Sequence, residues 1–226
     1  MRSNNTLFFD KDISLSIIKN KKIGIIGYGN QGRAQALNLK DSGLSIKVGV
    51  RNINSIEKNL LKSDIVYDSI ENVSLWADII CMLVSDASIP SVFNTKIKSH
   101  LNENDTILFS HGFSITYNLI QPPENVDVIM VAPSGGGQMV RNEFKKNRGV
   151  PALLAIEQNY SGNALDTAKA YSKALGSARV CSFLSTFKEE TETDLFGEQA
   201  LLTGALPYMI DKSLKVLLEE GYSPVV

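Results

Sequence analysis

Residues 22–43, KIGIIGYGNQGRAQALNLKDSG, decide the fold of this 226-residue chain. The stretch opens with a β-branched run typical of a buried strand and continues as a helical pattern that stops at Gly43. Between the two lie Gly27, Gly29 and Gly32, which permit a tight turn, close approach of the backbone to a pyrophosphate, and close packing of helix on strand. Free N–H groups at the start of such a helix face a bound phosphate. The stretch therefore predicts a dinucleotide-binding strand–turn–helix unit; a glycine turn kept only for packing is the alternative.

Strand-like runs then alternate with helical stretches at intervals of roughly 20 to 30 residues, as in a parallel sheet whose crossovers are helices. Strands are expected at 22–27, 45–51, 64–68, 78–84, 105–112, 127–137 and 151–158, with the run 178–185 closing the region. Helices are expected at 31–43, 55–62, 69–77, 89–101 and 161–177. This alternation predicts the α/β class, with a doubly wound, Rossmann-type, mostly parallel sheet over residues 1–185. Residues 186–226 show two helical stretches and no strand, which predicts the beginning of a separate helical domain.

The composition argues against two classes of partner. Lysine plus arginine (23) balances aspartate plus glutamate (24), so no overall field favours nucleic acid or an anionic membrane surface. No apolar run approaches the ~18 residues of a membrane span, and the N-terminal residues lack the apolar core of a signal peptide. Of the two cysteines, Cys81 lies in an apolar run and is expected to be a buried, reduced thiol. We therefore expect a cytoplasmic protein.

The end of the second expected strand should set the cofactor specificity. An NAD site would place an acidic residue there to bind the ribose hydroxyls, whereas this chain has Arg51, followed by Asn54 and Ser55. A guanidinium suits a 2′-phosphate, which favours NADP. A solvated loop arginine is the alternative.

A histidine and a glycine loop follow two later strands. His111 ends the expected strand 105–112, and the carboxyl ends of strands line the ligand crevice of such sheets. A histidine there can relay a proton near neutral pH, although one that only bonds to backbone groups is the alternative. The loop at 132–141, with three consecutive glycines, can lie close against a ligand or be a simple flexible turn.

Five acids lie within ten residues near the C-terminal end of the sequence: Glu189, Glu190, Glu192, Asp194 and Glu198. From these residues alone, some of the acids are expected to belong to a solvated helix start and others to a metal site.

Together these residues form a set that resembles ketol-acid reductoisomerase, also called acetohydroxyacid isomeroreductase. The resemblance covers nearly the whole chain. It rests on FFDKDISLSIIKNKKIGIIGYGNQGRAQALNLKDSG (8–43), FSHGFSI (109–115), QPPENVDVIMVAPSGGG (121–137), RGVPALLAI (148–156) and FKEETETDLFGEQALLTG (187–204).

The resemblance implies an enzyme that converts a small 2-hydroxy-3-keto acid. Its substrates are 2-acetolactate and 2-aceto-2-hydroxybutyrate, reduced and isomerised to 2,3-dihydroxy-3-methyl carboxylates in branched-chain amino acid synthesis with NADPH and two magnesium ions. Asp194 and Glu198 match the first pair of magnesium ligands, on one helix face, and His111 matches the active-site histidine. The other three acids are expected to stay solvated or to shape the local field. The cofactor contacts implied by the resemblance are Gly27, Tyr28, Gly29, Asn30, Gln31, Gly32, Arg51, Asn54, Ser55, Asp86, Ala87, Ser88, Ile89 and Gly137.

The sequence departs from the family pattern where chemistry is expected. Ser134 replaces a lysine that bonds substrate oxygen, so this position can donate a hydrogen bond but supplies no cation. Arg33 stands for a histidine, and Ser85 for a proline. The family continues into further helices of a knotted domain, which carry more magnesium ligands and a dimer interface, so a homo-oligomer or a pairing with another chain is expected. The alternatives are a reductase acting only on a 2-keto acid or imine, and a non-catalytic nucleotide-binding partner subunit.

Overall fold

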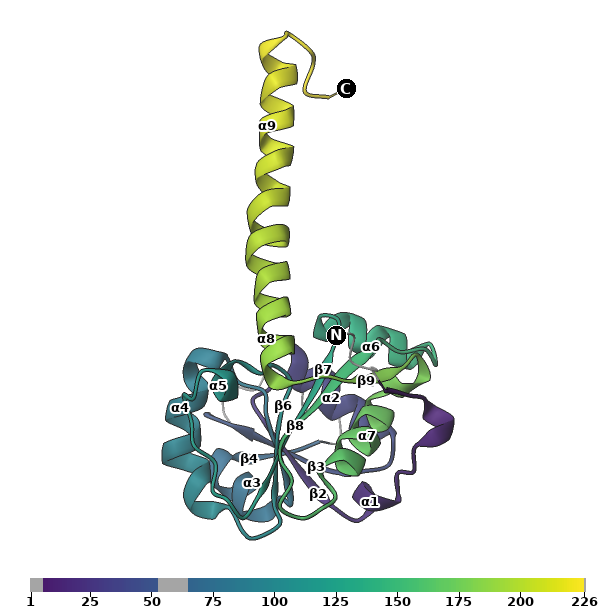
Figure 1. Ribbon diagram of the computed structural model, residues 1–226, viewed down its shortest axis with the longest axis vertical. Helices are drawn as coiled ribbons and strands as arrows, with labels where there is room; N and C mark the ends of the chain where they lie inside the picture. The colour runs from purple at the N-terminus through teal and green to yellow at the C-terminus, as the bar shows by residue number, and fades with distance from the viewer. Residues whose placement is uncertain (1–5, 53–64, 226) are drawn as a thin grey trace.

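The computed structural model describes residues 6–52 and 65–225, which form a nine-stranded sheet with helices on both faces and a long projecting helix (Figure 1). The strands are β1 (Leu7–Phe8), β2 (Lys22–Ile26), β3 (Ser45–Val50), β4 (Val66–Ser69), β5 (Ile79–Met82), β6 (Thr106–Phe109), β7 (Asp127–Pro133), β8 (Ala152–Gln158) and β9 (Ser182–Leu184). The helices are α1 (Ser16–Lys19), α2 (Asn30–Asp41), α3 (Ile70–Trp76), α4 (Ile89–Val92), α5 (Phe113–Thr116), α6 (Gly137–Lys145), α7 (Ala164–Leu175), α8 (Phe187–Leu195) and α9 (Leu206–Glu219). Short 3-10 turns are η1 (Asp10–Asp12), η3 (Asp86–Ser88), η5 (Lys98–His100) and η6 (Ser177–Arg179), and π-helical stretches are η4 (Phe93–Ile97) and η7 (Phe196–Ala205).

The sheet has the order β1-β9-β8-β7-β6-β5-β2-β3-β4. Strands β2 to β7 are mutually parallel, and the chain leaves β2 first toward β3 and β4, then returns to place β5 on the other side. The doubly wound, mostly parallel sheet predicted from the sequence is confirmed. The topology puts its switch point between β2 and β5, where ligand crevices of such sheets open.

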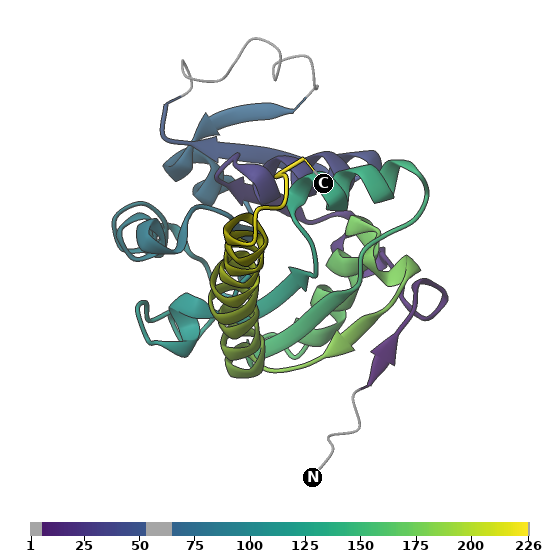
Figure 2. The same cartoon turned by 90° about the horizontal axis from the view of Figure 1, so that it is seen from above.

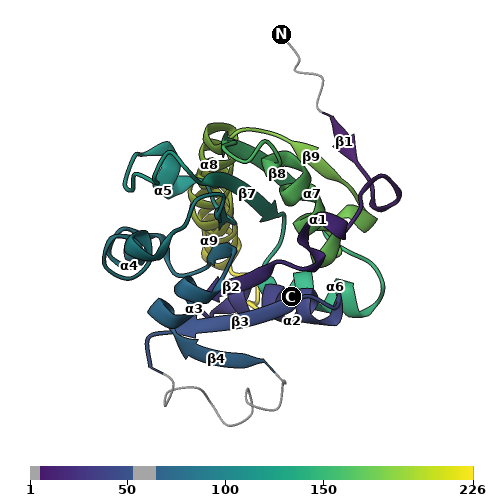
Figure 3. The same ribbon diagram turned by 90° about the horizontal axis from the view of Figure 1, so that it is seen from below.

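The sheet separates two hydrophobic layers because successive side chains of a strand point to opposite faces. In β5, Cys81 packs toward the layer that holds α1, α2 and α7, while Ile80 and Met82 pack toward the layer that holds α3, α4 and α5. Figure 3 shows these two groups of helices on opposite sides of the strands. Cys81 is a buried free thiol, as predicted.

Several elements differ from the sequence pattern, among them the helices α1, α5 and α6, which were not expected. Strand β1 is an unpredicted edge strand, which pairs antiparallel with β9 through Leu7 and Phe183. Strand β8 runs antiparallel to β7, which a hydrophobic run alone could not indicate. The expected helix 89–101 is divided into α4, η4 and η5. The expected helix 55–62 lies outside the described residues.

The two helical stretches expected after position 186 are parts of one uninterrupted helix made of α8, η7 and α9. Leu195 and Ala205, at the two junctions, keep right-handed helical backbone angles, so the chain never leaves the helical conformation. Pro207 lies within this helix, as the second residue of α9, directly after the π-helical stretch η7. Figures 1 and 2 show this helix standing upright on the body of the protein, attached only by its first turns.

Every residue from 206 to 225 is exposed, and many of them are large and apolar: Leu206, Tyr208, Met209, Ile210, Leu214, Val216, Leu217, Leu218, Tyr222 and Val225. Crossing a bilayer requires a long helix of high mean hydropathy, and the described residues contain none.

Candidate functional site

The glycine motif lies at the switch point of the sheet. Strand β2 ends at Ile26, Gly27 turns the chain with a φ of 102°, and α2 begins at Asn30 directly after Gly29. A cavity of about 250 Å³ opens here, lined by Gly27, Tyr28, Gly29 and the residues that follow β3 and β5. The predicted strand–turn–helix unit is therefore formed, with the N-terminus of α2 beside a cavity that a nucleotide can enter.

The three glycines of the motif have different steric roles. A Cβ atom at Gly32 would overlap the carbonyl oxygen of Gly27, and one at Gly27 would lie 2.6 Å from the carbonyl oxygen of Leu83. A Cβ atom at Gly29, in contrast, would meet nothing within 4 Å. Gly27 and Gly32 are thus required by packing, whereas the empty space at Gly29 is free for a ligand.

Arg51 follows β3 and lines the same cavity, in an exposed position. Its guanidinium makes no ion pair with any described residue. The two other residues expected near a 2′-phosphate, Asn54 and Ser55, lie outside the described residues.

The turn η3, also expected to contact the cofactor, faces two cavities. Ser88 lines the cavity beside the glycine motif, whereas Asp86 and Ala87 line a neighbouring one of about 530 Å³ together with His111. Burial raises the pKa of Asp86, and the nearby His111 opposes that rise. The side chain of Ile89 is buried in the core, which leaves only its backbone for contact with a ligand.

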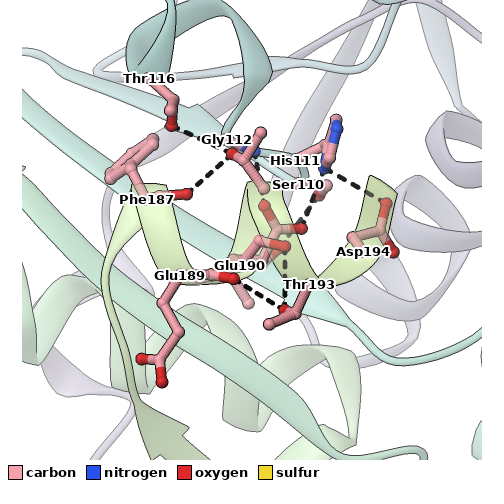
Figure 4. Close-up of polar contacts among 11 residues, drawn as sticks. Ser110, His111, Gly112, Thr116, Phe187, Glu189, Glu190, Thr193 and Asp194 are labelled. Atoms are coloured by element: carbon pink, nitrogen blue, oxygen red, sulfur yellow. Dashed lines mark hydrogen bonds and ion pairs between the residues drawn. The ribbon is translucent and has the colours of Figure 1, made fainter. Parts of the chain in front are cut away.

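His111 follows the carboxyl end of β6 and is held by an acid from the C-terminal helix (Figure 4). Its Nδ1 atom lies 3.1 Å from Oε1 of Glu190, and the N–H of Gly112 donates to Oε2 of the same carboxylate at 2.8 Å. A carboxylate accepts on both oxygens, so this arrangement places the Nδ1 proton of His111 toward Glu190 and leaves Nε2 for a ligand. The hydrogen bond from Glu190 raises the pKa of His111, against the effect of burial.

Glu190 was expected to stay solvated or to shape the local field, and it is not solvated: the residue is 4% exposed, and its carboxylate contacts His111 and Gly112. The side chain of Thr186 caps α8 by accepting from the N–H of Glu189, and Phe187 packs into the core. These contacts turn the face that carries Glu190 and Thr191 onto α5 and the carboxyl end of β6, where the hydroxyls of Thr116 and Thr191 lie 3.0 Å apart. The acid is buried because its helix is docked.

Asp194 and Glu198, the two expected metal ligands, lie beside His111 on the wall of a cavity of about 580 Å³. One ligand atom each from His111, Glu190 and Asp194 lies within 4.8 Å of the others, and Asp194 Oδ2 is 3.6 Å from His111 Nδ1. Burial and the neighbouring carboxylates raise the pKa of Asp194. A divalent cation would relieve this crowding of acidic oxygens, and carboxylate oxygens are the ligands that Mg²⁺ prefers, so the residues present fit such an ion.

The opposite wall of the same cavity is the glycine loop. Ser134, Gly135 and Gly136 line it after β7, and Gln31 from α2 reaches it from the nucleotide side. The structure thus brings together His111, Ser134 and the pair Asp194 and Glu198, which come from three separate parts of the sequence. Glu190 lines the same cavity, although it was expected only to stay solvated or to shape the local field.

The two steric classes of glycine give a matched pair of variants. Gly32→Ala is expected to lower the free energy of unfolding by about 1–3 kcal/mol because its Cβ overlaps the Gly27 carbonyl. Gly29→Ala is expected to leave that free energy within about 0.5 kcal/mol of the parent chain, while weakening the binding of NADP. Urea denaturation and a nucleotide titration measure the two effects. Undiminished binding by Gly29→Ala would show that the phosphates lie elsewhere.

A second test concerns the contact between His111 and Glu190. Glu190→Gln removes the acceptor charge, so the pKa of His111 is expected to fall in an NMR titration of the imidazole resonances. Because the pKa is raised in the folded state, the stabilisation from His111 is present at low pH and is lost as the pH rises through the folded value. Glu189→Gln is the control, since it changes the same charge one residue away without contact to His111. An equal response to both variants would exclude a direct effect.

Comparison with known proteins adds two family matches. Residues 17–181 match the family described as "Acetohydroxy acid isomeroreductase, NADPH-binding domain", and residues 187–226 match "Ketol-acid reductoisomerase, C-terminal domain". The chain is 49% identical over 221 residues to a protein of Pyrobaculum neutrophilum named "Ketol-acid reductoisomerase (NADP(+))", covering 97% of the chain and 67% of that relative. It is 45% identical over 218 residues to a protein of the same name from Methanocaldococcus jannaschii, covering 96% of the chain and 66% of that relative.

A solved structure agrees with these matches. The NADH-preferring ketol-acid reductoisomerase from an uncultured archean superposes with a TM-score of 0.90 at 37% identity, over 97% of this chain and 68% of that one. The chain therefore spans about two thirds of the length of these relatives. With its glycine motif, its histidine and its acidic helix in place, the chain belongs to the ketol-acid reductoisomerase family.

Proposed function

We propose that this chain carries out NADP-dependent ketol-acid reductoisomerase chemistry in branched-chain amino acid synthesis. The substrates would be 2-acetolactate and 2-aceto-2-hydroxybutyrate, small 2-hydroxy-3-keto acids that become 2,3-dihydroxy-3-methyl carboxylates. One observation carries the proposal: His111, Asp194, Glu198 and the glycine loop surround a single cavity, which Gln31 connects to the nucleotide-binding turn. The family membership supports it.

The residues of the site have separable roles in this chemistry. Glu190 orients His111 so that Nε2 faces the ligand and can hold or pass a proton. Asp194 and Glu198 supply carboxylate oxygens to magnesium, whereas both oxygens of Glu190 are engaged by His111 and Gly112.

When bound, magnesium supplies Lewis-acid polarisation of the substrate oxygens, and NADPH supplies the hydride. The chain's own contribution is to position both: the turn at Gly27–Gly32 receives the pyrophosphate, and the glycine loop borders the reacting end of the cavity. Leu153 and Leu202 supply apolar parts of the wall of this cavity.

Ser134 favours a second candidate, a reductase that has lost the isomerisation step. It lines the cavity at the position where the family pattern has lysine, and its hydroxyl cannot stabilise developing negative charge as a cation does. Reduction of a simple 2-keto acid or imine needs no alkyl migration, and His111 can donate the proton that the reduced oxygen or nitrogen takes up.

Assembly and location belong to the same proposal. The exposed apolar side chains of α9 support association with a second chain, either a copy or a longer relative. The balanced charge supports a small-molecule enzyme without nucleic-acid or membrane partners, in the cytoplasm.

A two-substrate assay distinguishes the candidates. NADPH oxidation with Mg²⁺ is measured on 2-acetolactate, which needs isomerisation and then reduction, and on 3-hydroxy-3-methyl-2-oxobutyrate, which needs reduction only. Turnover of both is the expected result for the complete reaction. Turnover of only the second supports the reductase, and turnover of neither with NADPH bound contradicts both enzyme proposals on these substrates.

Ser134→Lys serves as the diagnostic variant in that assay. If the missing cation limits isomerisation, the variant is expected to raise turnover of 2-acetolactate by roughly 10²-fold and to leave the second substrate unchanged. Ser134→Ala, which changes the same position without adding charge, should give no rise.

The cofactor preference can be tested at Arg51. Two relatives are named for NADP(+) and one structure is named NADH-preferring, so the family name alone does not decide the preference. Arg51→Ala is expected to weaken NADPH binding by roughly tenfold to a hundredfold, because a charged partner of the 2′-phosphate is lost, and to leave NADH binding unchanged. Arg148→Ala, at an arginine that pairs with Glu143 and lines neither the cavity beside Arg51 nor the one around His111, is the control. Equal weakening of both nucleotides by Arg51→Ala would contradict the assignment.

A further inference from the structure

A chain of buried polar side chains runs from the core to the wall of the active-site cavity. The hydroxyl of Tyr171, on α7, donates to Oε1 of Gln35 at 2.9 Å. Nε2 of Gln35 donates to Oε1 of Gln31 at 3.2 Å and to Oγ of Ser110 at 2.9 Å. Nε2 of Gln31 then donates to the carbonyl oxygen of Gly135 at 2.9 Å. This series of hydrogen bonds thus links α7, α2 and the glycine loop.

The direction of these hydrogen bonds is determined at both ends. The hydroxyl of Ser110 donates to the carbonyl of Val131 at 3.0 Å, so its oxygen accepts from Gln35. The amide NH₂ of Gln35 must therefore face Ser110 and Gln31, and its carbonyl must face Tyr171. The same logic leaves Gln31 with its carbonyl toward Gln35 and its NH₂ toward Gly135.

Burial makes the reversed orientation of the Gln35 amide unfavourable. The side chains of Tyr171 and Gln35 are both 0% exposed, and the hydroxyl of Tyr171 sits beside the buried thiol of Cys81. A buried donor or acceptor that loses its partner has no water to replace it, so a flipped amide of Gln35 would leave several groups unsatisfied. The NH₂ of Gln35 thus holds the carbonyl end of the Gln31 amide, whose NH₂ end faces the carbonyl of Gly135.

The outer end of this series of hydrogen bonds lies at the wall of the ligand cavity. Gln31, Gly135 and Ser110 all line the cavity that holds His111. The loop is also seated on α2 at a second point, since a Cβ atom at Gly137 would overlap the backbone of Asn30. Two contacts thus tie the glycine loop to the nucleotide-binding helix: a steric one at Gly137 and a hydrogen-bonded one at Gly135.

We infer that Tyr171 and Gln35 are positioning residues, which set the amide of Gln31 and through it the glycine loop in the geometry that receives the nicotinamide end of the dinucleotide. This inference rests on the proposed function for its ligand. Neither residue touches the cavity wall itself, and both act through Gln31.

The test compares two hydroxyl deletions on the same helix. Tyr171→Phe removes the donor to Gln35, whereas Ser172→Ala removes an equally buried hydroxyl that pairs with Ser182 and has no connection to the loop. Tyr171→Phe is expected to weaken NADPH binding by roughly threefold to thirtyfold, and Ser172→Ala to leave it unchanged at a similar loss of thermal stability. Equal effects of the two variants on NADPH binding would overturn the inference.

Non-additivity separates positioning from general loosening of the fold. In a Gln31→Ala background the hydrogen bonds that connect Tyr171 to the glycine loop are already lost. Tyr171→Phe should then cause no further loss of NADPH affinity. The same further loss as in the parent chain would show that Tyr171 acts by another route.

A readout without cofactor keeps the inference separate from the proposed function. Solvent exchange of the Gln31 side-chain amide protons, followed by NMR, is expected to accelerate in Tyr171→Phe and not in Ser172→Ala. Failure of the parent chain to bind NADPH would contradict the proposed function; unchanged exchange in Tyr171→Phe would contradict the positioning role.

Discussion

The candidate site depends on one buried carboxylate. Glu190 accepts from the N–H of Gly112 and contacts the imidazole of His111, so a single side chain joins the C-terminal helix to the end of β6. Hydrogen bonds to a charged group contribute about 1.5–3 kcal/mol each, and a carboxylate buried without them would be strongly unfavourable. The contact between α8 and the end of β6 is too close for a side chain at position 112, because a Cβ atom at Gly112 would overlap the hydroxyl of Thr191. The orientation of His111 and the position of Asp194 both follow from this docking.

A second constraint comes from backbone contacts without side chains. The turn after β2 closes because Gly32 meets the carbonyl of Gly27, and the glycine loop closes on α2 because Gly137 meets Asn30. The nucleotide turn and the substrate loop therefore share one helix, α2, as their common support. This arrangement explains how a cavity formed by segments more than 100 residues apart keeps one geometry.

The fold was largely predictable from the sequence, and part of the site was not. The order of strands and helices followed from hydrophobic runs and glycines, which act locally. The burial of Glu190 was missed because a run of acids shows no hydrophobic contrast and is usually solvated. A helical signal was nevertheless present: Phe187, Glu190, Thr191 and Asp194 stand at positions i, i+3, i+4 and i+7 of one face, and the first three are buried. Strand directions and the unbroken junctions at Leu195 and Ala205 depend on tertiary contacts or on backbone angles, which residue patterns do not encode.

The continuous helix has a mechanical consequence. From Phe187 to Glu219 it is about 50 Å long at 1.5 Å per residue, and only its first turns are clamped to the sheet. Such a helix is a lever whose fulcrum is the contact at Glu190, and Asp194 and Glu198 lie on its long arm, close to that fulcrum. A force on the far end of the helix therefore changes the distance of these two carboxylates from His111.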